Sequence, residues 1–499
     1  MEIFDNLALG FSVAFSLQNL FYCFLGVLLG TLIGVLPGLG PVPTIAMLLP
    51  ITFGLPPVAA LIMLAGIYYG AQYGGSTTAI LINLPGESSS VVTAIDGYQM
   101  ARQGRAGAAL ATAALGSFFA GSVATFLLAV FAPPLSDLAL KFGPPEYFAL
   151  MVLGLVASVA LASGSVVKAL AMVVLGILLG LSGQDVYTGT PRFTFNMIDL
   201  ADGIEFVALA MGVFGLGEIV RNLEEEHTRT VMVQKVKGLL LSKEDIKRIA
   251  GPVLRGTFLG SFLGILPGGG AVLSSFASYS IEKKISREPQ RFGKGAIEGV
   301  AGPESANNAG AQTSFIPMLT LGIPSNPVMA LMIGALIIQG IVPGPNVVNE
   351  QPDLFWGIVA SMWIGNFMLV VLNLPLIGIW VRLLTVPYHI LFPLIVGFCC
   401  IGVYSVNNNA IDVFTMALFG LVGYALVKLD CEPAPLLLGF IIGPMLEEYL
   451  RRAMLISRGD PLVFVTRPIS ATMLALAALA LIVVLLPSVR KKREEAFQE

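Results

Sequence analysis

The sequence predicts an all-α polytopic membrane protein, and three observations lead to this fold class. Of its 499 residues, 56% are hydrophobic and only 12% are charged, whereas soluble globular proteins carry about 25% charged residues. The apolar residues lie in long runs, and a helix that spans a bilayer needs roughly 20 mainly apolar residues. The runs lack the alternation of polar and apolar side chains, over roughly ten residues, that is typical of an outer-membrane barrel.

Windowed hydropathy places thirteen apolar runs in two series. The runs are 18–36, 56–74, 106–131, 146–163, 166–182 and 204–220, and then 251–266, 326–342, 355–380, 389–404, 411–427, 433–446 and 469–486. We therefore expect about 11–13 transmembrane helices, together with broken or re-entrant helical hairpins.

Charged residues are concentrated between the two series. Residues 221–300 hold 21 of the 59 Asp, Glu, Lys and Arg residues. Their basic residues and the cluster 490–493 favour the cytoplasmic side under the positive-inside rule. Glu2 and Asp5 precede the first apolar run without a basic segment, so we do not expect a cleaved signal peptide. The net charge of −3 gives no indication of a nucleic-acid partner.

An internal repeat is the most informative feature. The segment GTLIGVLPGLG at 30–40 recurs as GSFLGILPGGG at 260–270, 230 residues later, with six of eleven positions identical. A second, shorter repeat supports the first. The Gly-Ala-Gln at 70–72 recurs at 310–312, and the Leu-Pro-Gly at 84–86 corresponds to the Ile-Pro-Ser at 323–325. Secondary transporters are commonly built from such halves.

The repeat predicts four regions. Residues 1–220 form the first membrane half, 221–250 a charged cytoplasmic connector, 251–468 the second membrane half, and 469–499 a final transmembrane helix with a basic cytoplasmic tail. Five runs between the two Pro-Gly motifs would make the halves parallel. We favour inverted halves, because the run 166–182 is short and carries Lys168, and 42–51 can add a partial crossing.

Pro37-Gly38 and Pro267-Gly268 each end an apolar run. Proline lacks an amide hydrogen and glycine tolerates unusual dihedral angles, so the backbone leaves the helix with unpaired groups. Such groups are tolerated at membrane depth only when buried in protein or lining a polar cavity. Two matching breaks therefore indicate one shared cavity, although a single break is more often a surface turn. We interpret the glycines at 30, 34, 260 and 264 as packing residues.

Two polar stretches, 73–90 and 302–326, lie inside apolar surroundings and are too polar to face lipid. Hydroxyls, amides and free N–H groups at helix starts favour an anion, while carbonyl and amide oxygens suit sodium. The alternative is ordinary interhelical hydrogen bonding. The substrate-binding candidates are Ser76, Thr77, Thr78, Asn83, Pro85, Gly86, Asn307, Asn308, Pro324, Ser325 and Asn326. The ion-binding candidates are Gly38, Gly40, Asn83, Gly268, Gly270, Asn308 and Thr320.

Four acidic residues near these stretches leave several roles open. Glu87, Asp96, Glu298 and Glu304 can pair with sodium, relay protons or face water. Asp96-Gly97 and Glu298-Gly299 are dipeptides that commonly mark turns, which favours a structural or gating role for these two acids.

Enzymatic chemistry has little support. The sequence lacks a Gly-x-x-x-x-Gly-Lys-Ser/Thr loop and a His-Glu-x-x-His motif. Its two histidines, His227 and His389, are far from the serine-rich stretches, and its four cysteines lack metal-type spacing. We therefore expect no enzyme, no metal beyond sodium and no organic cofactor.

The quoted motifs resemble those of the large membrane subunit of the tripartite tricarboxylate transporter family, the TctA type. The resemblance covers nearly the whole chain. It rests on 34–40, 69–87 and 96–98, and on the Gly-Pro-Glu-Ser-Ala-Asn-Asn of 302–308 with the Leu-Gly-Ile-Pro of 321–324. It implies the translocation subunit of an elevator-type importer in the bacterial inner membrane, with a small TctB-like membrane subunit and a periplasmic TctC-like binding protein. Citrate and other carboxylates would be carried, driven by a sodium or proton gradient.

Two other classes stay open on the sequence. One is a stand-alone channel or exporter, which would need neither partner. The other is a membrane assembly scaffold without a transport path of its own, in which the polar stretches would serve only to join helices.

Overall fold

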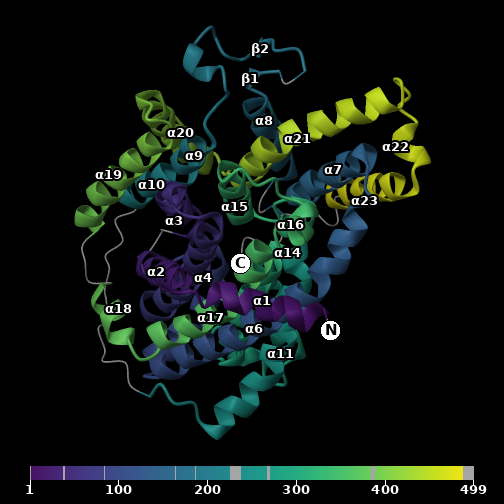
Figure 1. The fold of residues 1–499 in the computed structure, drawn as a ribbon. Coiled ribbons are helices and arrows are strands. Elements are labelled where there is room, and N and C mark those ends of the chain that lie inside the picture. Colours follow the sequence, from purple (N-terminus) through teal and green to yellow (C-terminus); the bar gives the residue numbers. More distant parts are fainter. Residues whose placement is uncertain are drawn as a thin grey trace.

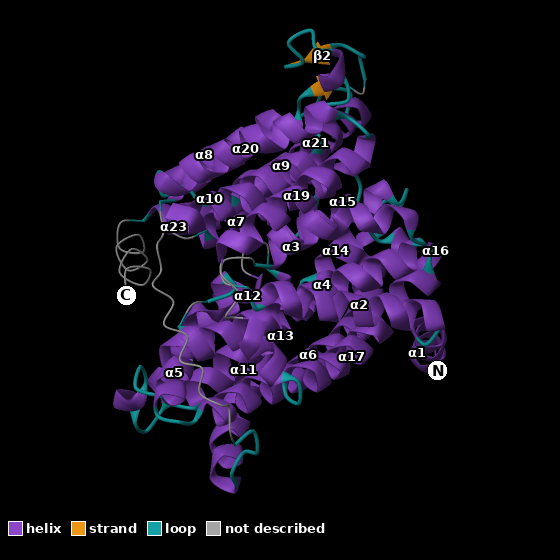
Figure 2. Cartoon of the chain, turned by 90° about the vertical axis from the view of Figure 1, so that its left-hand side faces the viewer, coloured by secondary structure: helices purple, strands orange, loops and turns teal. Residues whose placement is uncertain are grey.

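The computed structural model describes residues 2–36, 40–83, 85–162, 165–185, 187–224, 238–266, 270–383 and 388–486. Helices make up nearly all of this part (Figures 1 and 2), and its only strands are β1 (Gly183–Gln184) and β2 (Pro191–Arg192), which pair antiparallel in a small hairpin. The prediction of an all-α protein is confirmed.

The chain up to the charged connector contains ten α-helices and four shorter helical segments. They are α1 (Glu2–Ala14), α2 (Leu17–Gly34), α3 (Pro41–Leu48), η1 (Leu49–Gly54), α4 (Pro57–Ile82), η2 (Ser88–Ser90), α5 (Val91–Arg102), α6 (Ala106–Ala139), α7 (Pro144–Leu161), α8 (Val166–Gly180), η3 (Ile198–Leu200), α9 (Phe206–Ala210), η4 (Met211–Leu216) and α10 (Gly217–Glu224).

The remainder of the described chain contains thirteen α-helices and one short 3-10 segment. They are α11 (Lys243–Ile265), α12 (Gly270–Ile285), η5 (Pro289–Arg291), α13 (Glu298–Thr313), α14 (Phe315–Leu321), α15 (Pro327–Ile338), α16 (Asn346–Glu350), α17 (Pro352–Asn373), α18 (Ile377–Leu383), α19 (Tyr388–Asn407), α20 (Ala410–Lys428), α21 (Ala434–Ile456), α22 (Val463–Thr466) and α23 (Pro468–Leu485).

Every one of the thirteen apolar runs coincides with a helix. Within the described residues, five helices are long and apolar enough to cross a membrane on their own, namely α2, α6, α17, α20 and α23, and several shorter apolar helices accompany them. A polytopic membrane protein is therefore the fold class. Polar residues are nevertheless buried within helices: α4 continues through Ser76–Thr78, and the polar α13 is almost completely buried.

The helices form two groups, which Figure 2 shows one above the other. The core group contains α2–α6 and α11–α17, and the outer group contains α7–α10 and α19–α23. In the outer group α8 packs on α21, α7 on α23, and η4 on α20. Helices α3 and α15 lie at the boundary, where α3 contacts η4 and α15 contacts α21.

The duplication seen in the sequence is also a duplication of packing in the core group. Helix α2 packs on α4, and α11 packs on α13. A Cβ atom added at Gly30 would overlap the backbone of Ile67, and one added at Gly260 would overlap the backbone of Ala306. The interpretation of these glycines as packing residues is confirmed, because each allows two helix backbones to touch.

Each half contributes one helix that packs on the other half. Helix α6 of the first half packs on α11 and α13, and α17 of the second half packs on α2 and α4. Helices α6 and α17 run antiparallel, since Trp363 bonds to Ser122 and Asn366, one turn later, bonds to Phe118.

Helix α2 runs parallel to α17, because Cys23 approaches Ser361 and both Cys23 and Val27 contact Gly365. Helix α11 runs parallel to α6, because Asp245 pairs with Arg105 and Val253 contacts Gly116. The equivalent helices α2 and α11 therefore point in opposite directions, which is the arrangement of inverted halves.

The β-hairpin precedes one end of a continuous helical segment, and Glu224, the last described residue before 225–237, lies at its other end. Helices α9, η4 and α10 run without interruption from 206 to 224, about 28 Å at 1.5 Å per residue, which is close to the thickness of a bilayer core. The hairpin projects beyond the helices in Figure 2. Arg192 on β2 pairs with Glu447 of α21 at 2.8 Å, which holds the hairpin against the outer group.

Candidate functional site

The first half is interrupted after α4. Asn83 adopts a left-handed conformation with φ 58° and ends this helix, and Pro85 and Gly86 follow. Gly86 lies directly on Gly75, where its N–H donates to the Gly75 carbonyl at 3.4 Å. Glu87 then caps η2, which leads into α5. The chain thus turns back toward α4 through a segment without regular hydrogen bonding.

The second half is interrupted in the same way after α14. Gly322 adopts a left-handed conformation with φ 71° and ends that helix, and Pro324 follows two residues later, as Pro85 follows Asn83. Asn326 occupies the position that corresponds to Glu87. Its side chain accepts a hydrogen bond from the N–H of Met329 at 3.0 Å and so caps α15.

These interruptions lie next to the breaks of the repeated Pro-Gly motif. Pro37, Gly38, Pro267 and Gly268 lie outside the described residues, but the glycines that follow them are described. Gly40 precedes α3, and a Cβ atom added at Gly40 would lie 3.8 Å from the Cβ of Glu87. Gly270 begins α12, and a Cβ atom added at Gly270 would lie 3.3 Å from the Cβ of Asn326. Each half therefore brings two helix starts together, α3 with η2 and α5 in the first half, and α12 with α15 in the second.

The interrupted segments of the two halves also meet each other. Asn307 of α13 donates to a Glu87 oxygen at 3.1 Å, and Ser275 of α12 donates to the carbonyl of Ser89 at 2.8 Å. The hydroxyl group of Tyr68 on α4 lies near both Glu87 and Asn326. The two broken regions therefore form one polar zone between the halves, which we call the hairpin site (Glu87, Asn307, Asn326 and the adjoining helix starts).

Several buried polar atoms of the core group have no hydrogen-bond partner in the described structure, and one of them belongs to the hairpin site. They include both amide atoms of Gln72, the Oε1 of Gln312 and the Oδ1 of Asn307. Gln72 and Gln312 occupy equivalent positions of the two halves, 240 residues apart. An unpaired buried polar group costs about 1–3 kcal/mol, so such groups mark places where a ligand or ordered water binds.

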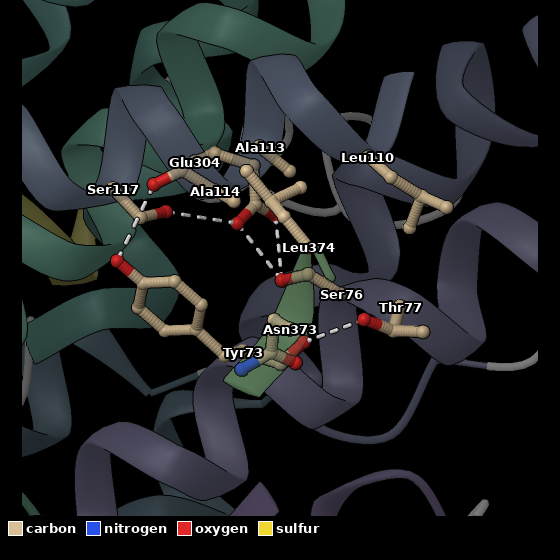
Figure 3. Close-up of a pocket in the computed structure, with 10 residues that line it drawn as sticks. All are labelled: Tyr73, Ser76, Thr77, Leu110, Ala113, Ala114, Ser117, Glu304, Asn373 and Leu374. Carbon is tan, nitrogen blue, oxygen red and sulfur yellow. Dashed lines mark hydrogen bonds between the residues drawn. The ribbon is translucent and has the colours of Figure 1, made fainter. Parts of the chain in front are cut away.

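A second polar cluster surrounds Glu304 of α13, and we call it the Glu304 pocket. Glu304 is 1% exposed, and its carboxylate accepts hydrogen bonds from Ser76 of α4 at 2.8 Å and 2.9 Å, from Thr93 of α5, and from Ser117 of α6 at 3.5 Å. Figure 3 shows the Ser76 and Ser117 hydroxyls directed at this carboxylate. The remaining lining residues are Tyr73, Thr77, Leu110, Ala113, Ala114, Asn373 and Leu374.

The predicted site residues fall into three groups. The first group flanks the hairpin interruptions and contains Gly40, Asn83, Pro85, Gly86, Gly270, Asn307, Pro324, Ser325 and Asn326. In this group the side chain of Asn83 is exposed, so its clear contribution is the left-handed turn.

The second group belongs to the Glu304 pocket. Ser76 binds the Glu304 carboxylate, Thr77 lines the pocket, and Asn308 donates to Ser117 at 2.7 Å and to the Glu304 carbonyl at 3.1 Å. The third group is satisfied by helix backbone. Thr78 donates to the carbonyl of Gly74, and Thr320 donates to the carbonyl of Ile316. Gly38 and Gly268 lie outside the described residues.

The expectation that Asp96-Gly97 and Glu298-Gly299 form turns is wrong, because the first lies within α5 and the second within the first turn of α13. Asp96 is fully buried and reaches the second half. It accepts hydrogen bonds at 2.8 Å from the N–H groups of Gly295 and Ala296, just before α13, and one from Tyr279 at 2.9 Å. These contacts support a structural role for Asp96, which joins the two halves.

Among the side chains that bind the Glu304 carboxylate, sequence reasoning singled out Ser76 but missed Thr93 and Ser117, and it also missed Asn373 in the same pocket. Thr93, Ser117 and Asn373 come from three different helices, outside the two polar stretches. Their only signal in the sequence is a polar residue in an apolar helix, which is usually interhelical hydrogen bonding. The repeated glutamines at 72 and 312 were visible in the Gly-Ala-Gln repeat, but a repeat alone does not show that a side chain lacks a partner.

The fold and the site define a polytopic helical membrane protein with an inverted, duplicated core and a polar zone where broken helices meet. The chain belongs to the tripartite tricarboxylate transporter TctA family, whose family model matches residues 20–438.

Two proteins of Agrobacterium vitis are similar to this chain. One is described as an uncharacterized 52.8 kDa protein in the TAR-I ttuC' 3' region, and it is 67% identical over 499 residues, which cover 100% of this chain and 99% of that protein. The other is a protein in the TAR-II ttuC' 3' region, 66% identical over 240 residues, which cover 48% of this chain and 99% of that protein. No solved structure matches the chain.

Proposed function

We propose that this protein is the translocation subunit of a binding-protein-dependent secondary transporter in the bacterial inner membrane. It imports tricarboxylates or related carboxylates such as citrate, coupled to a sodium or proton gradient. A periplasmic TctC-like binding protein delivers the substrate, and a small TctB-like membrane subunit completes the complex. The core group carries the substrate site and moves against the outer group in the manner of an elevator.

The observation that carries this proposal is the meeting of four helix starts at the hairpin site. The N-terminus of a helix bears a partial positive charge and free N–H groups, which favour an anion. Helices α3, α12 and α15, and α5 through η2, all begin at the interruptions that meet around Glu87 and Asn326. The unpaired Oδ1 of Asn307 adds an amide acceptor beside them.

The charges at this place support ion coupling. Within the described residues, no Lys, Arg or His forms an ion pair with Glu87 or Glu304, so neither carboxylate has a basic partner. An anionic substrate and two carboxylates in one low-dielectric region repel each other strongly. A cation that enters with the substrate removes this repulsion, which is the physical basis of symport here.

Reconstituted uptake tests the proposal. The complete complex in proteoliposomes, with its binding protein outside, takes up radiolabelled carboxylates from a panel only when a sodium or proton gradient is imposed. Uptake that ignores every gradient and needs no binding protein would identify a channel or exporter instead. A complex that assembles but carries none of the panel would favour the scaffold class.

Neighbouring asparagines give a sharper test. Asn308→Ala removes donors to Ser117 and to the Glu304 carbonyl, and we expect it to abolish gradient-dependent uptake in a complex that still assembles. Asn307→Ala removes the donor to Glu87, and we expect it to raise the KM for the carboxylate about tenfold, since one charge-assisted hydrogen bond contributes about 1.5–3 kcal/mol. Normal uptake by the Asn308 variant would contradict the assignment.

A further inference from the structure

We propose that Glu304 is the centre of a binding site for one monovalent cation, sodium or a proton, which is built from oxygen atoms of both halves. The ligands are the Glu304 carboxylate and the hydroxyls of Ser76, Thr93 and Ser117, with the amide oxygen of Asn373 in the same pocket. The role of this cation in coupling rests on the function proposed above, whereas its binding does not.

Burial without a positive partner is the first argument. Glu304 is 1% exposed and lies in a helix whose side chains are buried on all faces. A charged carboxylate that is removed from water and left unpaired costs several kcal/mol, and proteins avoid this by pairing the group or neutralising it. Buried glutamates elsewhere in this chain follow that rule, since Glu146 pairs with Arg467 at 2.8 Å and Glu282 with Arg255 at 2.6 Å. Glu304 has three hydroxyls in place of an arginine.

The hydroxyls fit either form of a single positive charge. A hydroxyl donates a hydrogen bond to an ionised carboxylate and accepts one from a protonated carboxyl. Hydroxyl and carboxylate oxygens are also the ligands that hard cations prefer. Ser76 is on α4, Thr93 on α5 and Ser117 on α6, so three helices of the first half converge on one residue of the second half.

An unpaired oxygen in the same pocket is the second, independent argument. Asn373 ends α17 and is 4% exposed, and its amide nitrogen donates to the Leu369 carbonyl at 2.9 Å. Its Oδ1 atom has no partner in the described structure, although Asn373 lines the pocket with Glu304 (Figure 3). A buried amide oxygen without a donor is the group that a cation, or a water bound to it, would satisfy.

The other titratable groups near Glu304 do not supply the missing charge. Glu87 carries the same sign, and Tyr73 of α4 bonds to Asn366 at 3.0 Å. Asp96, one turn from Thr93 on α5, is satisfied by Tyr279 and backbone N–H groups. Glu282 of α12 is paired with Arg255.

Binding is tested on the solubilised full-length chain, without substrate. We expect the thermal midpoint of the wild type to rise when choline chloride is replaced by sodium chloride at equal ionic strength, and this rise to be absent in Glu304→Gln. If the charge is a proton, sodium has no effect, and the midpoint falls with rising pH more steeply in the wild type than in the variant. Glu146→Gln is the matched control, because it neutralises another buried glutamate outside the pocket, and it keeps the wild-type response.

Thr93→Val provides a second variant that leaves the carboxylate in place. It removes one hydroxyl with little change of volume, and we expect the sodium concentration for half-maximal stabilisation to rise at least threefold, or the pH midpoint to shift. The proposal is overturned if Glu304→Gln folds and responds to sodium and pH as the wild type does. If Glu304→Gln does not fold, an unchanged response of Thr93→Val overturns it.

Transport assays distinguish the proposal of a cation site at Glu304 from the proposed function of the protein. In proteoliposomes we expect Glu304→Gln to lose gradient-driven accumulation while it still exchanges labelled for unlabelled carboxylate across the membrane. A wild-type complex that binds the cation but carries no carboxylate would reject the proposed function and leave the Glu304 site standing. Gradient-driven accumulation by Glu304→Gln at the wild-type rate would reject the site and leave the proposed function standing.

Discussion

The segments that follow α4 and α14 show the same sequence of backbone features but carry different side chains at one equivalent position. A left-handed residue ends the first helix in both, Asn83 in one half and Gly322 in the other, and a proline follows two residues later. Where the first half has Glu87, the second has Asn326. The shared backbone provides helix starts on both sides of the site, so the difference between the halves is one of charge, and the charge lies on the first half.

The largest expected effect concerns what the halves share. Gly30→Ala and Gly260→Ala each push a Cβ into the backbone of the partner helix, at Ile67 and at Ala306 respectively. Overpacking of a tight contact costs about 1–3 kcal/mol and sometimes more, and backbone atoms cannot move aside as a side chain does. We expect each variant to lose most of its monodisperse peak in fluorescence-detected size-exclusion chromatography.

Gly54→Ala is the control for the glycine variants, because a Cβ there has no atom within 4 Å. It should behave as the wild type does. If Gly30→Ala is tolerated while Gly260→Ala is not, the two helix pairs are not equivalent in packing, and the comparison between the halves holds for the backbone path alone.

The sequence predicted this shared framework well, for a physical reason. Close helix contact requires glycine, and helix interruption in the membrane requires glycine and proline, so both leave a mark in the sequence that a repeat makes visible. All thirteen apolar runs became helices because a lipid-facing or core helix must be apolar along its length. The polar helix α13 could not be predicted from an apolar run, since its residues are buried by other helices and do not face lipid.

The site was predicted less completely. Ser76 and Asn308 were identified within polar stretches, but the contact of Ser76 with the Glu304 carboxylate and that of Asn308 with Ser117 depend on how α4, α6 and α13 cross. Thr78 and Thr320 carry a hydroxyl group, as a binding residue would, yet these hydroxyls donate to helix carbonyls one turn earlier. Residue type and spacing indicate the polar zone, whereas the direction of each side chain follows from packing.

The next largest effect is expected when a carboxylate is added to the second half at Asn326, the position equivalent to Glu87. Asn326→Asp keeps an oxygen that can cap Met329 but adds a second carboxylate to the hairpin site, which already contains Glu87. Like charges a few ångströms apart in a protein interior repel by about 2–3 kcal/mol. We expect the KM for a carboxylate to rise tenfold or more in the reconstituted uptake assay.

Two further variants sharpen this comparison. Asn326→Ser keeps the cap without the charge and should change the KM less than about threefold. The double variant Glu87→Gln with Asn326→Asp moves the charge from one half to the other, and we expect it to recover part of the lost affinity. A double variant that is worse than either single variant would show that the hairpins differ in more than charge.

The smallest expected effect lies at the N-terminal ends of α6 and α11, where the halves are also joined. Arg105 pairs with Asp245 at 2.6 Å, but the arginine side chain is 38% exposed, so water and salt screen the pair. Exposed ion pairs contribute about 0–1 kcal/mol. We expect Arg105→Gln to lower the thermal midpoint in detergent only slightly, and the difference from the wild type to vanish at high choline chloride.

The contrast with Glu304→Gln is informative, because both variants remove one charge between the same halves, in water in one case and in the protein interior in the other. A large, salt-independent loss of stability in Arg105→Gln would mean that this pair, rather than the buried contacts of Asp96 with Tyr279 and the N–H groups before α13, holds the inverted halves together.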